Sequence, residues 1–135
     1  MNVPSITPAQ RYKNCQEAIT WLCDNLGFSK VVVHESDGVV HHALLRIENG
    51  MIMISSSGKS DFDQYVCPPS ELGNKNTQSA YIYIPKIEEH YKQILNKKVE
   101  VVLPMTEEPH GKGFTCRDPE GYLWSFGNYN PWDNI

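Results

Sequence analysis

Apolar residues recur every three to four positions in two segments of the chain, which is the spacing of an amphipathic helix. In the first segment, Asn14 and Glu17 resemble a capping box, and Gly27 supplies a left-handed stop. The pattern therefore predicts a helix over residues 15–26. Its apolar face is formed by Ile19, Leu22, Cys23 and Leu26.

The second helical segment begins near Pro85, a residue suited to a first helical turn, and ends near Asn96. Its apolar face is formed by Ile87, Tyr91, Ile94 and Leu95.

Runs rich in β-branched and aromatic residues alternate with turn signals such as Asp37-Gly38 and Asn49-Gly50. We interpret these runs as eight strands, four before and four after residue 60. They span residues 5–12, 29–35, 39–47, 51–55, 79–84, 99–103, 113–117 and 122–126.

The order of these elements, β-α-β-β-β, occurs twice. Gly50 and Gly121 precede the last strand of each copy and are 71 positions apart, while the first strands are offset by 72 positions, from Thr7 to Ser79. Because one such unit cannot bury both faces of its sheet, we expect an α+β fold of two paired units. We expect the units to form a curved mixed sheet around a cavity, with helices on the convex face. Unit one covers residues 5–57, a polar linker 58–77, and unit two 78–132, within a single domain of residues 1–135.

The composition excludes several classes of protein. With 135 residues and 40% hydrophobic content, the chain can bury one substantial core. The net charge of −4 and the lack of a basic run argue against nucleic acid binding. No apolar run has membrane-spanning length and no signal peptide is visible, so we expect a cytoplasmic protein without a membrane partner.

The four cysteines show no metal-binding or redox spacing. Cys15 and Cys23 lie in the helical pattern, Cys116 lies in a strand, and Cys67 lies in the linker. We expect reduced, mostly buried thiols.

The most informative stretch is the turn Asp118-Pro119-Glu120-Gly121 followed by the aromatic strand Tyr122-Leu123-Trp124-Ser125-Phe126. Alternation along this strand places Ser125 toward the cavity and Trp124 and Phe126 toward the helix. On the same argument Tyr81 and Tyr83 face the cavity. Trp124, Phe126 and Trp21 are expected in the core.

With its two β-α-β-β-β units, this turn and the helix entry Ala18-Ile19-Thr20-Trp21, the chain resembles the vicinal oxygen chelate superfamily. That group includes glyoxalase I, extradiol dioxygenases, fosfomycin resistance enzymes and bleomycin resistance proteins. The likeness covers about residues 6–132. It implies a cavity between the units and a homodimer with a two-fold interface.

Metal-dependent relatives carry His, Glu or Gln on the concave face at four positions. Those positions correspond here to Thr7, Ile54, Ser79 and Ser125, none of which is a usual ligand of a divalent ion. A register slip at Ile54 to Met53 or Ser55 restores no site. The resemblance is therefore to metal-free, bleomycin-resistance-like members, with no cofactor and no catalytic residue expected.

These observations predict a protein that binds and sequesters a small, partly aromatic molecule, with antibiotics among the candidates. Flat rings suit stacking on a planar ligand, and arginines suit an anionic group. For each aromatic residue a packing role is the alternative, and for Phe62 and Tyr65 packing of the linker on the sheet is the favoured one. The expected ligand-binding residues are Arg11, His42, Arg46, Phe62, Tyr65, Tyr81, Tyr83, Ser125, Tyr129 and Trp132.

Two other functions stay open. One is a metal-dependent lyase or dioxygenase of glyoxalase type with ligands such as His42, His110 or Glu107. The other is a structural or regulatory partner whose cavity is filled by its own side chains.

Overall fold

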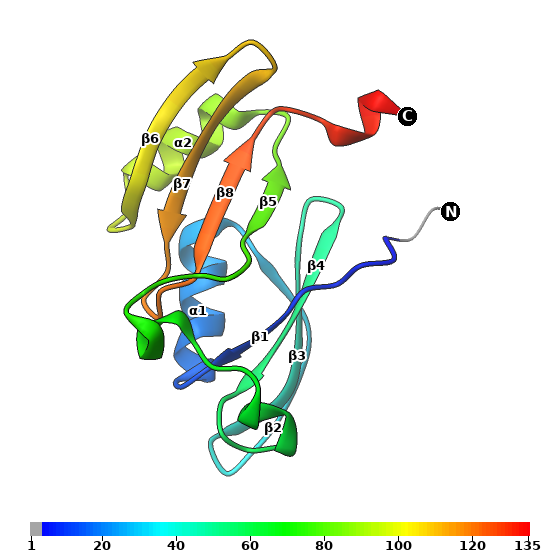
Figure 1. Cartoon of the computed structure of the whole chain (residues 1–135), viewed down its shortest axis with the longest axis vertical. Coiled ribbons are helices and arrows are strands. Elements are labelled where there is room, and N and C mark those ends of the chain that lie inside the picture. The colour runs from blue at the N-terminus through cyan, green and yellow to red at the C-terminus, as the bar shows by residue number, and fades with distance from the viewer. Residues whose placement is uncertain (1–3) are drawn as a thin grey trace.

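The computed structural model describes residues 4–135 and has two units of the order β-α-β-β-β (Figure 1). Each unit has a four-stranded mixed sheet, with strand orders β1-β4-β3-β2 and β5-β8-β7-β6. The α+β class and the repeat predicted from sequence are thus confirmed, although the sheets are two separate curved sheets. The first unit contains β1 (Ala9–Tyr12), α1 (Cys15–Leu26), β2 (Ser29–Ser36), β3 (Val39–Ile47) and β4 (Gly50–Ser56). The second contains β5 (Ala80–Tyr83), α2 (Ile87–Leu95), β6 (Glu100–Glu108), β7 (Gly111–Arg117) and β8 (Leu123–Gly127).

In the first unit, α1 covers one face of the sheet. Ala43 and Leu45 of β3 and Ile52 and Ile54 of β4 are buried on that face. They pack in one cluster with the apolar stripe of α1, including Leu22. Burial of such side chains is the main stabilising contribution to the unit.

The second unit repeats this arrangement, with α2 behind its sheet in Figure 1. Phe114 of β7 stacks on Phe126 of β8, and both belong to the core, together with Trp124. Trp124 and Phe126 are 0% and 1% exposed, as predicted. On α2, Ile87 and Ile94 are buried, whereas the prediction for Leu95 is wrong because this last helical residue is 55% exposed.

The start of α1 differs from the sequence prediction. Gly27 adopts the expected left-handed conformation with φ 97°. At the other end, the Asn14 side chain makes no capping hydrogen bond within the described residues. Instead the Glu120 carboxylate accepts hydrogen bonds from the backbone N–H groups of Lys13 (2.6 Å) and Asn14 (2.9 Å). A remote acidic side chain thus takes the place of the local cap.

Two strands also differ in length from the prediction. β1 begins at Ala9 rather than residue 5, because Pro8 cannot donate a backbone hydrogen bond, although its carbonyl accepts one from Met53. β6 extends to Glu108 rather than residue 103 and accommodates Pro104 within a register shift. The other strand ends agree with the prediction within two residues.

Linker residues 57–79 contain two short 3-10 turns, η1 (Asp61–Gln64) and η2 (Pro69–Leu72). The second packs on the turn between β7 and β8, where Ser70 donates its backbone N–H to the carbonyl of Glu120. Gly121 has φ 96° in that turn, and a side chain there would collide with Asn74 and Pro69. The short tail turn η3 (Pro131–Asn134) ends the fold.

The four cysteines are unpaired in the part of the chain that the structure describes. Cys15 and Cys116 are buried, while Cys23 and Cys67 are half-buried. Burial raises the pKa of the Cys15 and Cys116 thiols to about 12. Neither is a reactive thiolate at neutral pH.

Of the helices among residues 4–135, none is long and apolar enough to span a bilayer.

Candidate ligand-binding faces

Each sheet has one face against its helix and one face away from it, which we call the open face. Because side chains alternate along a strand, the residues between the buried positions point to the open face. In the first sheet this open face carries Arg11 on β1, His42, Leu44 and Arg46 on β3, and Met51, Met53 and Ser55 on β4.

Arg11 is the most constrained of these residues. Its Nε donates to Oδ1 of Asp63 in η1 over 3.1 Å, and its guanidinium lies 5.3 Å from the ring centre of Phe62. Asp63 in turn accepts hydrogen bonds from the backbone N–H and hydroxyl of Ser60. Burial raises the pKa of Asp63, but the hydrogen bonds from Ser60 and Gly58 and the charge of Arg11 outweigh it, so the net pKa is lowered. The linker therefore places an ionised carboxylate on Arg11.

The remaining polar groups of this face lie farther along the sheet. His42 is the register partner of His34, and their rings stack at 6.3 Å between centres. Arg46 is exposed and donates from Nε to the carbonyl of Glu48. The first open face is thus cationic on its strands.

The second open face is aromatic and hydroxylic. Tyr81 of β5 is the register partner of Ser125 of β8, which is also the partner of Thr115 of β7. The Ser125 and Thr115 hydroxyl oxygens lie 2.8 Å apart. Tyr81 is 44% exposed, and its hydroxyl donates to the carbonyl of Tyr129 over 2.7 Å.

Gly127 explains how the Tyr81 ring is seated. A Cβ at Gly127 would lie 2.7 Å from the Tyr81 hydroxyl oxygen and 3.0 Å from the carbonyl of Lys112. Only glycine leaves room for the tyrosine to lie across the end of β8. The adjacent Tyr83 is half-buried and is the register partner of Gly127.

The C-terminal tail adds aromatic surface beside Tyr81. The Tyr129 ring lies 6.4 Å from that of Tyr81 and packs edge-on against His110 at 5.4 Å. Its hydroxyl accepts a hydrogen bond from Asn134, while Trp132 is 72% exposed.

The ten expected ligand-binding residues therefore fall into two groups. Arg11, His42 and Arg46 lie on the first sheet, with Phe62 against Arg11, and Tyr65 follows in the linker with 80% of its surface exposed. The second group consists of Tyr81, Tyr83, Ser125, Tyr129 and Trp132. The structure places the groups on two separate sheets, whereas the sequence led us to expect one sheet around one cavity.

Three of the four positions carried over from metal-dependent relatives lie elsewhere than the sequence led us to expect. Ile54 is 1% exposed and packs in the core, because its register partner Ala43 faces α1. Its neighbour Ser55 occupies the open face, beside Arg11. Thr7 and Ser79 precede β1 and β5, so of the four positions only Ser125 lies in a strand and on an open face.

The donors at these positions do not fit a divalent ion. Ser125 and Thr115 offer neutral hydroxyls that bond to each other, and Ser55 adjoins the cationic Arg11. Among residues 4–135, His, Cys, Asp and Glu form no group of three or more that could hold a metal ion. The alternative ligands His42 and His110 lie in different units, against His34 and Tyr129 respectively.

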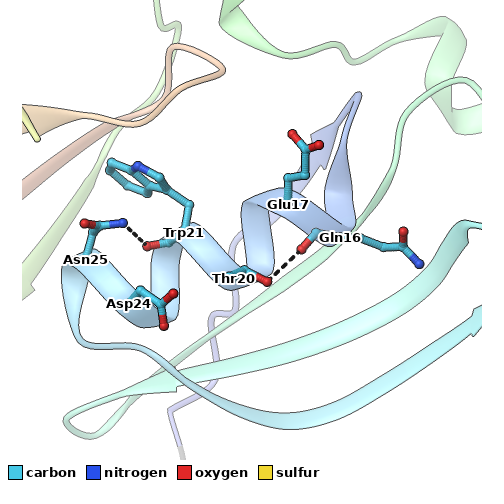
Figure 2. Close-up of a pocket in the computed structure, with 6 residues that line it drawn as sticks. All are labelled: Gln16, Glu17, Thr20, Trp21, Asp24 and Asn25. Carbon is cyan, nitrogen blue, oxygen red and sulfur yellow. Dashed lines mark hydrogen bonds between the residues drawn. The ribbon is translucent and has the colours of Figure 1, made fainter. Parts of the chain in front are cut away.

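Two hollows lie elsewhere on the described surface. One, of about 420 Å³, runs along α1 and is shown in Figure 2. The residues that line it include Glu17, Trp21 and Asn25, and the Asn25 side chain donates a hydrogen bond to the carbonyl of Trp21. The other, of about 200 Å³, lies between α1 and the turn Asp118-Pro119-Glu120. Neither hollow is lined by an expected ligand-binding residue.

Sequence reasoning missed Thr115 and Asp63 as members of the open faces. Alternation along residues 113–117, counted from the buried Phe114 and Cys116, gives the position of Thr115. Asp63 had no comparable signal, because only the folded linker brings it to Arg11.

The fold and these faces define a class of protein. The family model described as "Glyoxalase/Bleomycin resistance protein/Dioxygenase superfamily" matches residues 6–126. The chain therefore belongs to this superfamily, as the sequence resemblance predicted.

Solved structures of low sequence identity share the fold. The chain is similar to TioX from Micromonospora sp. ML1, with a TM-score of 0.73, 20% identity and coverage of 94% of this chain and 99% of that one. UcmS2 gives a TM-score of 0.76 at 14% identity, covering 95% and 99%. The fosfomycin resistance protein FosX from Listeria monocytogenes, in complex with Mn(II), gives 0.65 at 12% identity, covering 97% and 94%. No curated protein matches the chain.

Proposed function

We propose that this chain is a metal-free binding protein that sequesters a small, partly aromatic molecule against its open faces. The observation that carries the proposal is the pairing of the Ser125 and Thr115 hydroxyls on the open face that also carries the partly exposed Tyr81, the register partner of Ser125. Such a surface offers stacking and neutral hydrogen bonds, and it lacks the imidazole and carboxylate donors of a divalent-metal site.

Aromatic surface at the second face supports this function. Tyr81 is seated by Gly127 and by its hydrogen bond to the tail, so its ring is held in place before a ligand arrives. A ring that is already ordered loses little conformational entropy on binding, which favours affinity. Tyr129 and Trp132 extend the same surface.

The open faces also support a homodimer. Each open face can form only one side of a ligand site. Large apolar side chains are exposed on both faces, among them Met51, Leu103 and Trp132. Contact with a second copy would cover them and enclose a ligand between the walls. We propose such a two-fold dimer in the cytoplasm, with residues 1–135 acting as one binding domain.

Antibiotic sequestration is one form of this function. The similarity in fold to FosX, a fosfomycin resistance protein, favours this form over an unrelated cargo. The Mn(II) in that structure equally motivates the rival function, a metal-dependent enzyme of glyoxalase type.

Metal analysis and ligand screening separate the two functions. The purified protein is analysed for bound Zn, Mn, Ni and Fe, and its melting temperature is followed across a panel of planar aromatic compounds with and without a chelator. We expect less than stoichiometric metal and a chelator-independent shift, because a ligand that binds only the folded state raises stability by RT ln(1 + [L]/Kd). Stoichiometric metal with chelator-sensitive turnover would reverse the assignment.

Substitution at Tyr81 provides the matched control. Tyr81→Ala removes the stacking ring and should abolish the thermal shift while the free protein still melts cooperatively. Tyr81→Phe keeps the ring and loses only the hydrogen bond to Tyr129, so it should retain most of the shift.

A further inference from the structure

The linker turn η1 contacts the Arg11 side chain in the way that the anionic group of a ligand would contact it. The Arg11 and Asp63 side chains are only 16% and 7% exposed, and they meet through Nε and Oδ1 at 3.1 Å. The Phe62 ring lies against the same guanidinium. One short segment thus supplies a carboxylate and an aromatic ring to one arginine.

The carboxylate of Asp63 is oriented by its own turn. While Oδ1 accepts from Arg11, Oδ2 accepts from the Ser60 hydroxyl at 2.7 Å and from its backbone N–H at 3.1 Å. These bonds lie within the linker and belong to no strand of the sheet. The segment can therefore leave Arg11 without breaking a strand pairing.

The sheet itself favours an anion at this place. Arg11, His42 and Arg46 lie on the first open face, and the strand residues of that face include no acidic side chain. The terminal nitrogens of Arg11 have no hydrogen-bond partner within residues 4–135. The hydroxyl of Ser55, the register partner of Arg11, is likewise unpaired in the described part of the chain. Arginine nitrogens and a hydroxyl are donors suited to an oxyanion.

We propose that Asp63 is an internal stand-in for the anionic group of the ligand, so that the site selects aromatic oxyanions and their binding displaces η1 from Arg11. The inference rests on the proposed binding function and names its ligand class. Replacing the Asp63 carboxylate by another oxyanion keeps the charge of Arg11 balanced. A neutral ligand cannot make this exchange.

Two probes with the same ring system separate charge from stacking. 1-Anilinonaphthalene-8-sulfonate carries a sulfonate, and N-phenyl-1-naphthylamine is its uncharged counterpart. Dissociation constants for both are measured by fluorescence titration on the wild-type protein and on Asp63→Asn, Arg11→Met and Asp61→Asn. Asp61→Asn is the matched control, because Asp61 is an exposed acid of the same turn. Cooperative thermal melting of each variant shows that it is folded.

Removing the internal competitor should strengthen binding of the anionic probe only. For Asp63→Asn we expect the Kd of the sulfonate to fall about tenfold, while that of the neutral probe changes less than about twofold. Arg11→Met should raise the Kd of the sulfonate about tenfold and leave the Kd of the neutral probe unchanged. Asp61→Asn should change neither dissociation constant.

The outcomes distinguish this inference from the function on which it rests. If both probes bind and Asp63→Asn leaves the ratio of their dissociation constants unchanged, the role of Asp63 is overturned and the binding function stands. If neither probe binds to any folded variant, the binding function is overturned together with this inference.

Discussion

The buried carboxylate of Asp118 accepts a hydrogen bond from the Tyr12 hydroxyl over 2.6 Å, which joins the second unit to the first. The same carboxylate accepts from the indole N–H of Trp124 at 3.0 Å and from the backbone N–H groups of Glu120 and Tyr122. Burial raises the pKa of Asp118, and the four hydrogen bonds oppose that rise. The turn Asp118-Pro119-Glu120-Gly121 thus provides a buried polar connection between the two units.

Asp118→Ala should destabilise the protein by about 2–4 kcal/mol, because it leaves several buried donors without an acceptor. The midpoint of urea unfolding, followed by tryptophan fluorescence, measures the loss. Asp133→Ala is the control, since Asp133 lies in the exposed tail turn. Equal stability of the two variants would show that the joint contributes nothing.

Glu120 rather than Glu17 should support the start of α1. Glu120→Ala removes the acceptor for the N–H groups of Lys13 and Asn14 and should cost about 1 kcal/mol. Glu17→Ala, which tests the local capping box suggested by sequence, should change the free energy of unfolding by less than about 0.5 kcal/mol. Chemical denaturation of both variants measures the two losses of free energy of unfolding. A larger loss in Glu17→Ala would show that the local capping box, and not Glu120, supports the start of the helix.

His90 should make stability depend on pH. Its Nε2 lies 3.0 Å from the carbonyl of Leu26, its Nδ1 is buried without a partner among the described residues, and its ring packs on Phe114 and Phe126. Burial lowers the pKa of His90 below 6.5, and Lys97 acts in the same direction, while the bond to Leu26 and the charge of Glu48 oppose the shift.

Because the folded pKa is below the unfolded one, the unfolded state binds the proton first as pH falls. The contribution of His90 is therefore complete above pH 6.5 and is lost as pH falls from there toward the folded pKa. Urea unfolding between pH 8 and 5 should show this slope in the wild type and a smaller slope in His90→Gln. His41→Gln, at an exposed position, should keep it. An unchanged slope in His90→Gln would assign the pH dependence to other groups.

Gly127→Ala should lower stability by about 1–3 kcal/mol, since the added methyl group meets the Tyr81 hydroxyl and the Lys112 carbonyl. The substitution should also weaken the binding of aromatic ligands, because the Tyr81 ring must move. Gly50→Ala is a suitable control: its Cβ meets only a backbone oxygen at 3.5 Å, an ordinary contact. The melting temperature and its ligand-induced shift are measured on both variants. If the shift in Gly127→Ala equals that of the wild type, the position of the Tyr81 ring against Gly127 does not matter for binding.

Much of the fold could be predicted because its signals are local. The helix over residues 15–26 was found with its observed limits from apolar spacing and Gly27. The faces of Trp124 and Tyr81 followed from alternation by two. Ile54 was placed on the wrong face, because the carried-over position was one residue from Ser55 and a single step reverses the side chain.

The sequence by itself determined which segments become helices and strands, that the unit occurs twice, and that Trp124 and Phe126 of the last strand are buried. These properties depend on periodicity and turn residues within a few positions of the chain. The tertiary structure decided that Asp118 meets Tyr12, that Glu120 caps α1, and that Asp63 lies on Arg11. These pairs are separated by 52 to 107 positions, and no local pattern encodes such contacts, since they exist only once the sheets, the linker and the turn have packed together.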